Sequence, residues 1–237
     1  TQTVVDMGDI PANPFDIPEA IRQVELGTRA NLEQVDHLIT IGGDHTIALP
    51  ILRALHAIHG PIAVVHLDAH LDTWDTYFGQ PYTHGTPFLR ASEEGLLARG
   101  HCLHVGIRGP LYSREDLPRD STAGFSIITS DQVDVAGTTG VVEEMVMRTG
   151  GAPVYLSIDI DVLDPGFAPG TGTPEAGGLT SRELLRIVRG FRDVNLVGVD
   201  VVEVSPAYDH AQITGIAAAH TVYEALSVWA PQGAISD

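Results

Sequence analysis

Hydrophobic residues in this chain of 237 residues occur in short apolar runs that alternate with longer segments of helical spacing. The apolar runs predict strands over residues 3–8, 37–41, 61–67, 101–107, 125–129, 154–158 and 194–202. Helical spacing, with capping residues and early prolines, predicts helices over residues 16–32, 46–59, 86–95, 137–149, 181–191 and 213–229. The alternation predicts an α/β fold, a three-layer α-β-α arrangement with a mostly parallel sheet between helices.

Three segments between these elements show neither the apolar runs of a strand nor the spacing of a helix. Residues 73–83 are polar and aromatic, and we interpret them as an active-site loop. Residues 165–178 are rich in Gly and Pro, which is typical of a rigid, shaped loop over a site rather than of a flexible linker. The segment between the strands at 101–107 and 125–129 is rich in Pro, Arg and Asp, and we expect it to be a loop.

Composition adds limits on class, location and partners. The length predicts one large domain, and 43% hydrophobic residues with 25 Gly and 15 Pro are typical of a globular enzyme. The net charge of −18 argues against nucleic acid or an anionic membrane as a partner, because both require a basic surface. No apolar stretch approaches the roughly 18 residues of a membrane span, and no signal sequence precedes the first motif. We therefore expect a cytoplasmic protein.

Carboxylates and imidazoles gather where three predicted strands end, in the segments GGDH (42–45), DAHLD (68–72) and DID (159–161). Alternate residues of an extended segment point to one face, so these side chains can address a common point. The candidate metal ligands are His45, Asp68, His70, Asp72, Asp159 and Asp161. Two imidazoles and four hard carboxylates, with no thiolate nearby, suit Mn²⁺ better than structural zinc.

A single Asp or His at a strand end is usually a cap or a solvated loop residue, so the joint pattern carries the argument. Four carboxylates in a partly dry site would repel one another unless cations neutralised them. Six ligands are too many for one tetrahedral ion that keeps a position open for water. Two ions that share two bridging carboxylates would use all six. We therefore expect two Mn²⁺ per chain.

The motifs GGDH, DAHLD and SIDIDVLDP, followed by PGTGTPEAGGLTSRE and DVVEVSP, resemble the ureohydrolase family of arginases and agmatinases. The resemblance runs from about residue 37 to the C-terminus. It implies an arginase-like fold, residues 1–237 being a single ureohydrolase domain without an N-terminal segment that the family usually carries. It also implies a binuclear manganese hydrolase that acts on a small guanidino compound, and a homo-oligomer, commonly a trimer or hexamer.

The resemblance also implies how the two ions are held. It assigns one ion to His45, Asp68, Asp72 and Asp159 and the other to His70, Asp68, Asp159 and Asp161, so that Asp68 and Asp159 would bridge. Water that bridges two such ions would become hydroxide near neutral pH, because metals lower its pKa from ~15.7 toward about 7. This hydroxide would attack the guanidino carbon and release urea and an amine.

Three residues match catalytic positions of the family. Asp72 would take the proton of the nucleophile and pass it to the departing amine. His84 stands where the family has a proton-shuttling histidine, although a histidine there could instead cap the following helix. Glu203 matches the carboxylate that binds the guanidinium group, for which a bidentate charge-assisted pair is the natural geometry.

Other polar residues near the motifs are expected to have supporting roles. We expect Asp44 and Asp164 to orient ligands, His104 to be structural, and His66 to point away from the metals from inside its strand. Arg108 resembles the family as well, and an intersubunit salt bridge is one reading of it.

The loop at 73–83 bears on the substrate. Arginases hold the amino-acid end of arginine with Asn and Ser residues of this loop, whereas here the loop contains no Asn, Ser, Lys or Arg. Its aromatic rings suit a methylene chain, and Asp75 could either meet a distal ammonium group or brace a turn. The loop favours agmatine as substrate, with putrescine and urea as products.

Other functions stay open at this point. The first alternative is 4-guanidinobutyrate or another guanidino acid, as in guanidinobutyrase or proclavaminate amidinohydrolase, and formimino-group hydrolases share the ligands. A metal-binding scaffold without turnover is the alternative from another class. It would be favoured by loss of a ligand, of His84 or of Glu203, and none is lost.

Overall fold

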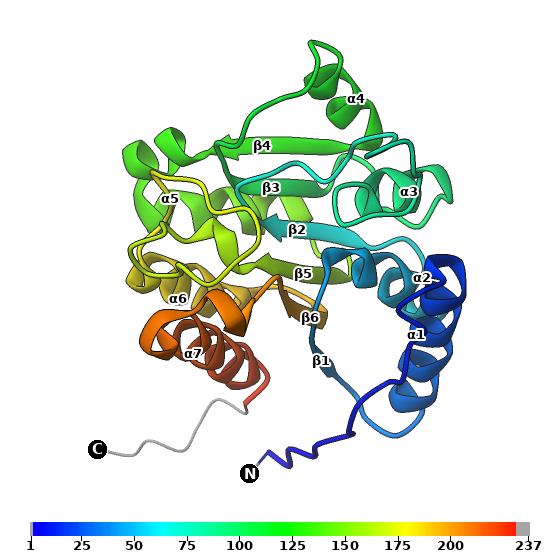
Figure 1. The fold of residues 1–237 in the computed structure, drawn as a ribbon. Coiled ribbons are helices and arrows are strands. Elements are labelled where there is room, and N and C mark those ends of the chain that lie inside the picture. The colour runs from blue at the N-terminus through cyan, green and yellow to red at the C-terminus, as the bar shows by residue number, and fades with distance from the viewer. Residues whose placement is uncertain (1, 231–237) are drawn as a thin grey trace.

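A computed structural model describes residues 2–230, which form a six-stranded sheet with helices on both faces (Figure 1). The strands are β1 (Leu38–Ile41), β2 (Ala63–Leu67), β3 (Cys102–Ile107), β4 (Phe125–Thr129), β5 (Val154–Asp159) and β6 (Leu196–Val202). All neighbouring strands are parallel, in the order β1-β6-β5-β2-β3-β4. The strands of a parallel sheet are buried on both faces, which explains their continuous apolar runs.

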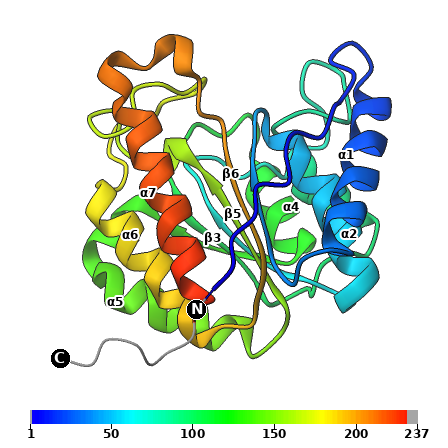
Figure 2. The same ribbon diagram turned by 90° about the horizontal axis from the view of Figure 1, so that it is seen from below.

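The helices form the two outer layers of the predicted three-layer fold (Figure 2). One layer holds α1 (Ile17–Leu32), α2 (Ala48–His59), α3 (Pro87–Glu93) and α4 (Asp116–Ala123), and the other holds α5 (Ser130–Thr149), α6 (Ser181–Arg189) and α7 (Ile213–Val228). A separate apolar core lies between the sheet and each layer. Leu49 and Phe88 pack with Tyr155 in the first core, whereas Met145 and Leu184 lie with the β-sheet residues of the second. The predicted α/β class is therefore confirmed.

The strand order decides where the predicted ligands meet. The chain builds β2, β3 and β4 outward in one direction and then returns to place β5 beside β2, with β6 between β5 and β1. As a result β1, β6, β5 and β2 are consecutive neighbours. The three ligand segments follow β1, β5 and β2, and Glu203 follows β6. The carboxyl ends of such strands are where ligands bind in open α/β sheets.

Two of the expected elements differ from the structure. The strand predicted at 3–8 is wrong, because these residues pair with no strand in the described chain and Val4 and Val5 are 61% and 60% exposed. An apolar run becomes a strand only where a sheet edge is available to it. The segment after β3 was expected to be a loop but contains α4, whose buried residues are Asp116, Asp120 and Ala123. It has no apolar stripe from which a helix could be recognised.

Helix α5 begins seven residues earlier than its predicted start at residue 137. Thr129 and Gln132 form a capping box that starts it, and Gly137, with φ of 65°, interrupts the regular helix. Side chains also cap the starts of two other predicted helices: Asp16 accepts a hydrogen bond from the Glu19 amide, and Thr180 forms a capping box with Glu183. Within residues 2–230, none of the helices combines the length and the apolar character required of a membrane span.

Candidate metal centre

Three predicted ligands come together with His66 in the first of two clusters. The side-chain donor atoms of His45, His66, Asp68 and Asp72 all lie within 4.8 Å of one another, and all four residues are buried. His45 Nδ1 lies 3.0 Å from Asp72 Oδ2 and 3.5 Å from Asp68 Oδ2. It also lies 3.5 Å from Oδ2 of Asp159, so that predicted ligand adjoins the same cluster.

The second cluster consists of Asp68, His70 and Asp161, whose donor atoms again lie within 4.8 Å of one another. His70 Nδ1 is 3.1 Å from Asp161 Oδ2 and 3.3 Å from Asp68 Oδ1. Asp68 thus offers one oxygen to each cluster, as a bridging carboxylate would. Asp159 differs, since its Oδ1 accepts a hydrogen bond of 2.9 Å from the Asp161 amide while its Oδ2 faces His45.

His66 lies at the site, and the expectation that it points away is wrong. Its Nε2 is 2.7 Å from Asp68 Oδ2. The physical reason is strand periodicity, because residue 66 lies in β2, residue 68 directly follows it, and residues two apart in extended backbone point to the same side. That signal was present in the sequence. Burial lowers the pKa of His66 to about 4, so the ring is neutral.

Buried polar side chains contact the His45 ring at Nε2, the nitrogen that does not face the carboxylates. His45 Nε2 lies 2.8 Å from Ser157 Oγ, and the Ser157 hydroxyl donates to Asp200 Oδ1 at 2.9 Å. Asp200 also accepts a hydrogen bond from the Tyr155 hydroxyl. These contacts fix the ring so that Nδ1 faces the carboxylates.

Other residues fasten the loops around the clusters. Within residues 2–230, the Arg108 guanidinium donates only to backbone carbonyls, among them those of Asp161 and Glu175, at 2.7 Å each. It therefore ties the ligand loop after β5 to the predicted loop at 165–178, which is a role that its sequence context did not indicate. Asp164 accepts hydrogen bonds of 2.8 Å from the amides of Gly166 and Gly177 and closes that loop, instead of orienting a ligand directly.

The carboxylates make the centre strongly electronegative. Burial raises the pKa of Asp159 well above its usual value, and the neighbouring carboxylates of Asp161 and Asp68 raise it further. Burial and Asp68 raise the pKa of Asp161 to about 6. Burial alone would lower the pKa of His70, but hydrogen bonding to Asp161 and Asp68 outweighs it and raises that pKa to about 12. The cluster therefore favours positive charge at its centre.

The donor atoms fit a hard divalent cation. His45 Nδ1, His66 Nε2 and Asp68 Oδ2 are buried and make no hydrogen bond in the described chain, although buried polar atoms normally make one. His66 Nε2 and Asp68 Oδ2 lie only 2.7 Å apart, but their contact is not a hydrogen bond. The donors are carboxylate oxygens and imidazole nitrogens, and the single cysteine, Cys102, is buried in the core on the helix α2 side. Oxygen-rich sites of this kind suit Mg²⁺, Ca²⁺ or Mn²⁺, and imidazole nitrogens favour Mn²⁺ among them.

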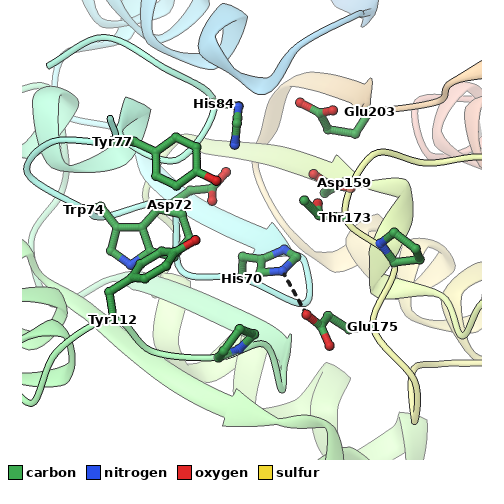
Figure 3. A pocket seen from close by; sticks show the side chains of 12 residues that line it. His70, Asp72, Trp74, Tyr77, His84, Tyr112, Asp159, Thr173, Glu175 and Glu203 are labelled. Atoms are coloured by element: carbon green, nitrogen blue, oxygen red, sulfur yellow. Dashed lines mark ion pairs between the residues drawn. The ribbon is translucent and has the colours of Figure 1, made fainter. Parts of the chain in front are cut away.

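A pocket of about 150 Å³ opens onto the clusters (Figure 3). Its lining comprises His70, Asp72, Trp74, Tyr77, His84, Pro110, Tyr112, Asp159, Thr173, Pro174, Glu175 and Glu203. The three predicted catalytic residues, Asp72, His84 and Glu203, therefore share one pocket. No Lys or Arg lies in this lining.

An ion-pair contact positions His84, and a hydrogen bond positions Glu203. His84 Nδ1 lies 3.7 Å from Asp44 Oδ2, and this pairing raises the pKa of His84 above its usual value despite burial. Glu203 Oε1 accepts a hydrogen bond of 2.8 Å from the His45 amide. Burial raises the pKa of Glu203, partly offset by that hydrogen bond.

An aromatic wall forms one side of the pocket. Trp74 stacks on Tyr77 with ring centroids 5.6 Å apart, and Tyr112 meets Trp74 edge-on at 4.6 Å. Figure 3 shows these rings across the pocket from Glu175, whose Oε1 lies 3.8 Å from His70 Nε2. Sequence reasoning identified the loop that carries Trp74 and Tyr77 but missed Tyr112, which follows β3.

Asp75 does not line the pocket. Its carboxylate pairs with the Arg90 guanidinium of α3 at 2.7 Å, which braces the loop. The suggestion that Asp75 receives a distal ammonium group is therefore wrong. Glu175, in the predicted loop over the site, is the carboxylate that occupies the outer pocket, and the TPE sequence within that loop was the available signal.

Comparison with known proteins places nearly all of the chain in one group. The model of the Arginase family matches residues 1–227. Putative agmatinase 3 of Schizosaccharomyces pombe is 44% identical over 95% of this chain and 61% of its own length, so the chain spans less than two thirds of that relative. The guanidinopropionase of Pseudomonas aeruginosa is 45% identical over 98% of this chain and 73% of its own length. The solved structure of proclavaminate amidinohydrolase from Streptomyces clavuligerus superposes with a TM-score of 0.91 at 43% identity, covering 95% of this chain and 75% of that one.

Proposed function

The chain belongs to the arginase family, and from this premise we propose that it is an amidinohydrolase that cleaves a small guanidino compound into urea and an amine. Membership confirms the resemblance read from the motifs and the arginase-like fold. The observation that carries the proposal is the shared pocket in which Asp72, His84 and Glu203 border a buried cluster of metal-type donors.

We propose that two Mn²⁺ ions occupy the centre. His45, Asp68, Asp72 and Asp159 would hold one ion, and His70, Asp68, Asp159 and Asp161 would hold the other. The contacts of Asp68 with both clusters support its bridging role, whereas the bridging of Asp159 rests on the family pattern. When bound, two such cations supply a water-derived nucleophile near neutral pH and offset the buried negative charge.

The chain's own residues would carry the protons and the substrate. Asp72 lines the pocket and lies beside His45, so its carboxylate is placed to accept a proton from water. Pairing with Asp44 favours the protonated ring of His84, which is then suited to donate a proton to the leaving amine. Glu203 uses Oε1 on the His45 amide, and no donor in the described chain bonds its Oε2, which leaves that oxygen for the guanidinium.

We propose agmatine as the substrate. The pocket lining contains four carboxylates, Asp72, Asp159, Glu175 and Glu203, and no cationic side chain of Lys or Arg. A substrate with an ammonium tail would find Glu175 in the outer pocket, and its methylene chain would lie against the aromatic wall of Trp74, Tyr77 and Tyr112. Agmatine has both features, and its products are putrescine and urea.

A guanidino acid is the second candidate. The 45% identity with a protein named guanidinopropionase favours it. A substrate carboxylate would need a cation from outside the described lining of the pocket. The relative kcat/KM for agmatine and for guanidino acids therefore tests whether the acidic lining of the pocket selects a cationic tail.

Two measurements test the proposal. Metal analysis of the manganese-loaded protein is expected to give two ions per chain, and a single tetrahedral zinc would contradict the metal assignment. Urea release should give a higher kcat/KM for agmatine than for 3-guanidinopropionate, 4-guanidinobutyrate or arginine. A faster carboxylate substrate would overturn the choice of agmatine, and no urea from any of them would favour a metal-binding scaffold without turnover.

A further inference from the structure

A row of buried polar side chains leads from α4 through β3 and β2 to the metal centre. Asp120 Oδ1 on α4 lies 2.9 Å from His104 Nε2. His104 Nδ1 lies 2.8 Å from His66 Nδ1 on the neighbouring strand, and His66 Nε2 lies 2.7 Å from Asp68 Oδ2. The row thus ends on the carboxylate that belongs to both metal clusters.

The burial of this row needs an explanation. Asp120, His104, His66 and Asp68 are all fully buried, and taking a carboxylate out of water costs several kcal/mol unless partners compensate. Replacing a buried polar network by apolar side chains of similar volume is often neutral or stabilising. Stability alone therefore gives no reason to place Asp120 beneath an apolar sheet.

The two rings of the row are held in position by packing. His66 faces Phe88 with ring centroids 4.4 Å apart, and His104 stacks on Phe125 at 4.0 Å with an interplanar angle of 13°. Strand register places His66 directly beside His104. Packing thus fixes both ring planes, and contacts of 2.9, 2.8 and 2.7 Å along the row join Asp120 to Asp68.

Asp120 also contacts the ligand loop at a second point. Its Oδ1 accepts a hydrogen bond of 2.8 Å from the hydroxyl of Thr73, the residue after the proposed ligand Asp72. One carboxylate on α4 therefore supports both the bridging ligand and the backbone that carries Asp72. Outer partners of metal ligands set ligand orientation in this way.

We propose that Asp120 is a positioning residue for the metal centre, acting on Asp68 through His104 and His66 and on the Asp72 loop through Thr73. This inference rests on the proposed manganese pair. Removing the carboxylate is expected to lower Mn²⁺ affinity by about 10- to 100-fold and to lower kcat while KM for the guanidino substrate changes little.

The test uses two variants and a matched control in the full chain. Asp120→Asn removes the charge at constant size, and His104→Phe breaks the row but keeps a ring on Phe125. Asp116→Asn is the control, because Asp116 is also a buried carboxylate of α4 but bonds the amides of Tyr112 and Ser113 instead of the row. The control should keep the wild-type Mn²⁺ affinity.

Two readouts separate positioning from a purely structural role. Electron paramagnetic resonance of the loaded protein reports the coupling between two Mn²⁺ ions, which changes if the bridging Asp68 moves. The rise in Tm on adding Mn²⁺ should shrink in Asp120→Asn and His104→Phe, whereas a structural defect would lower Tm equally with and without metal. Wild-type affinity and coupling in both variants would overturn the inference while leaving the proposed function intact. Failure of the wild type to bind a manganese pair would overturn both.

Discussion

Asp72 and Glu203 have left-handed backbone conformations, with φ of 53° and 63°. Such conformations cost of order 1–3 kcal/mol for residues other than glycine and persist only when the surroundings hold them. The Phe88 amide donates to the Asp72 carbonyl at 3.2 Å, and the Glu203 amide donates to the Gly43 carbonyl at 2.9 Å. The fold therefore maintains strain at two residues to which we assign chemistry.

Substitution of Glu203 by Gln should separate substrate binding from metal binding. The amide keeps the size of the side chain but removes the charge that would pair with the guanidinium, a loss of about 2–5 kcal/mol. We expect kcat/KM to fall by about 30-fold or more, with two Mn²⁺ still present. Steady-state urea release and metal analysis of the same preparation measure both. Unaltered turnover in Glu203→Gln would refute the assignment.

Manganese affinity should rise with pH. In the metal-free protein Asp161 and Asp68 raise the pKa of His70 to about 12, so near neutral pH its ring holds a proton that a metal must displace. Lowering the pH strengthens the proton as a competitor, and each displaced proton changes affinity by about tenfold per pH unit. Titrations between about pH 6 and 8, with calorimetry in buffers of different ionisation enthalpy, measure the slope and the protons released. An affinity independent of pH would contradict the assignment of His70.

At the scale of elements, the contribution of a helix cap to stability can be measured separately from catalytic activity. Asp16 caps α1, which packs on α2, and its side chain accepts from the Glu19 amide at 3.1 Å. Asp16→Ala should lower the free energy of unfolding by about 1 kcal/mol without changing kcat or KM. Asp9→Ala removes an equal charge from an exposed position that caps no helix, so it serves as the control. Urea denaturation gives both values, and equal midpoints for the two variants would contradict the role of the cap.

At the scale of the whole molecule, metal binding should be a large contribution to stability. Four buried carboxylates lie at the centre of a chain with a net charge of −18. With free Mn²⁺ at about 100 times its Kd, binding stabilises the folded state by about 2.7 kcal/mol. For a chain of this size Tm should rise by about 5–10 °C. Differential scanning calorimetry with Mn²⁺ and with a chelator measures the change, which should shrink in Asp159→Asn. An identical Tm in both conditions would argue against a manganese centre.

The homo-oligomer and the cytoplasmic location stay predictions from the sequence. Size-exclusion chromatography with light scattering would test whether the assembly is a trimer or a hexamer. Neither property was used to assign the pocket, whose lining was described for a single chain.

The sequence by itself determined the features that depend on near neighbours along the chain. Apolar runs specified all six strands, and capping residues specified the starts of α1 and α6, because propensity and capping are local. The proposed ligand motifs could also be identified from sequence, because alternate residues such as Asp68 and His70 follow the same strand and point to one side. The same local rule applied to His66 would have placed it at the site.

Tertiary structure alone decided which distant segments meet. The strand order, with β6 between β1 and β5, brings Glu203 beside His45, and no local pattern specifies it. The sequence around Asp75 was compatible with a side chain facing either the pocket or the surface, and the ion pair with Arg90 of α3 decides between them. Asp120 lies on a helix without an apolar stripe, so neither the helix nor its contact with His104 could be predicted. These features depend on packing between segments far apart in sequence. The whole fold, and not local propensity, determines which side chains come into contact there.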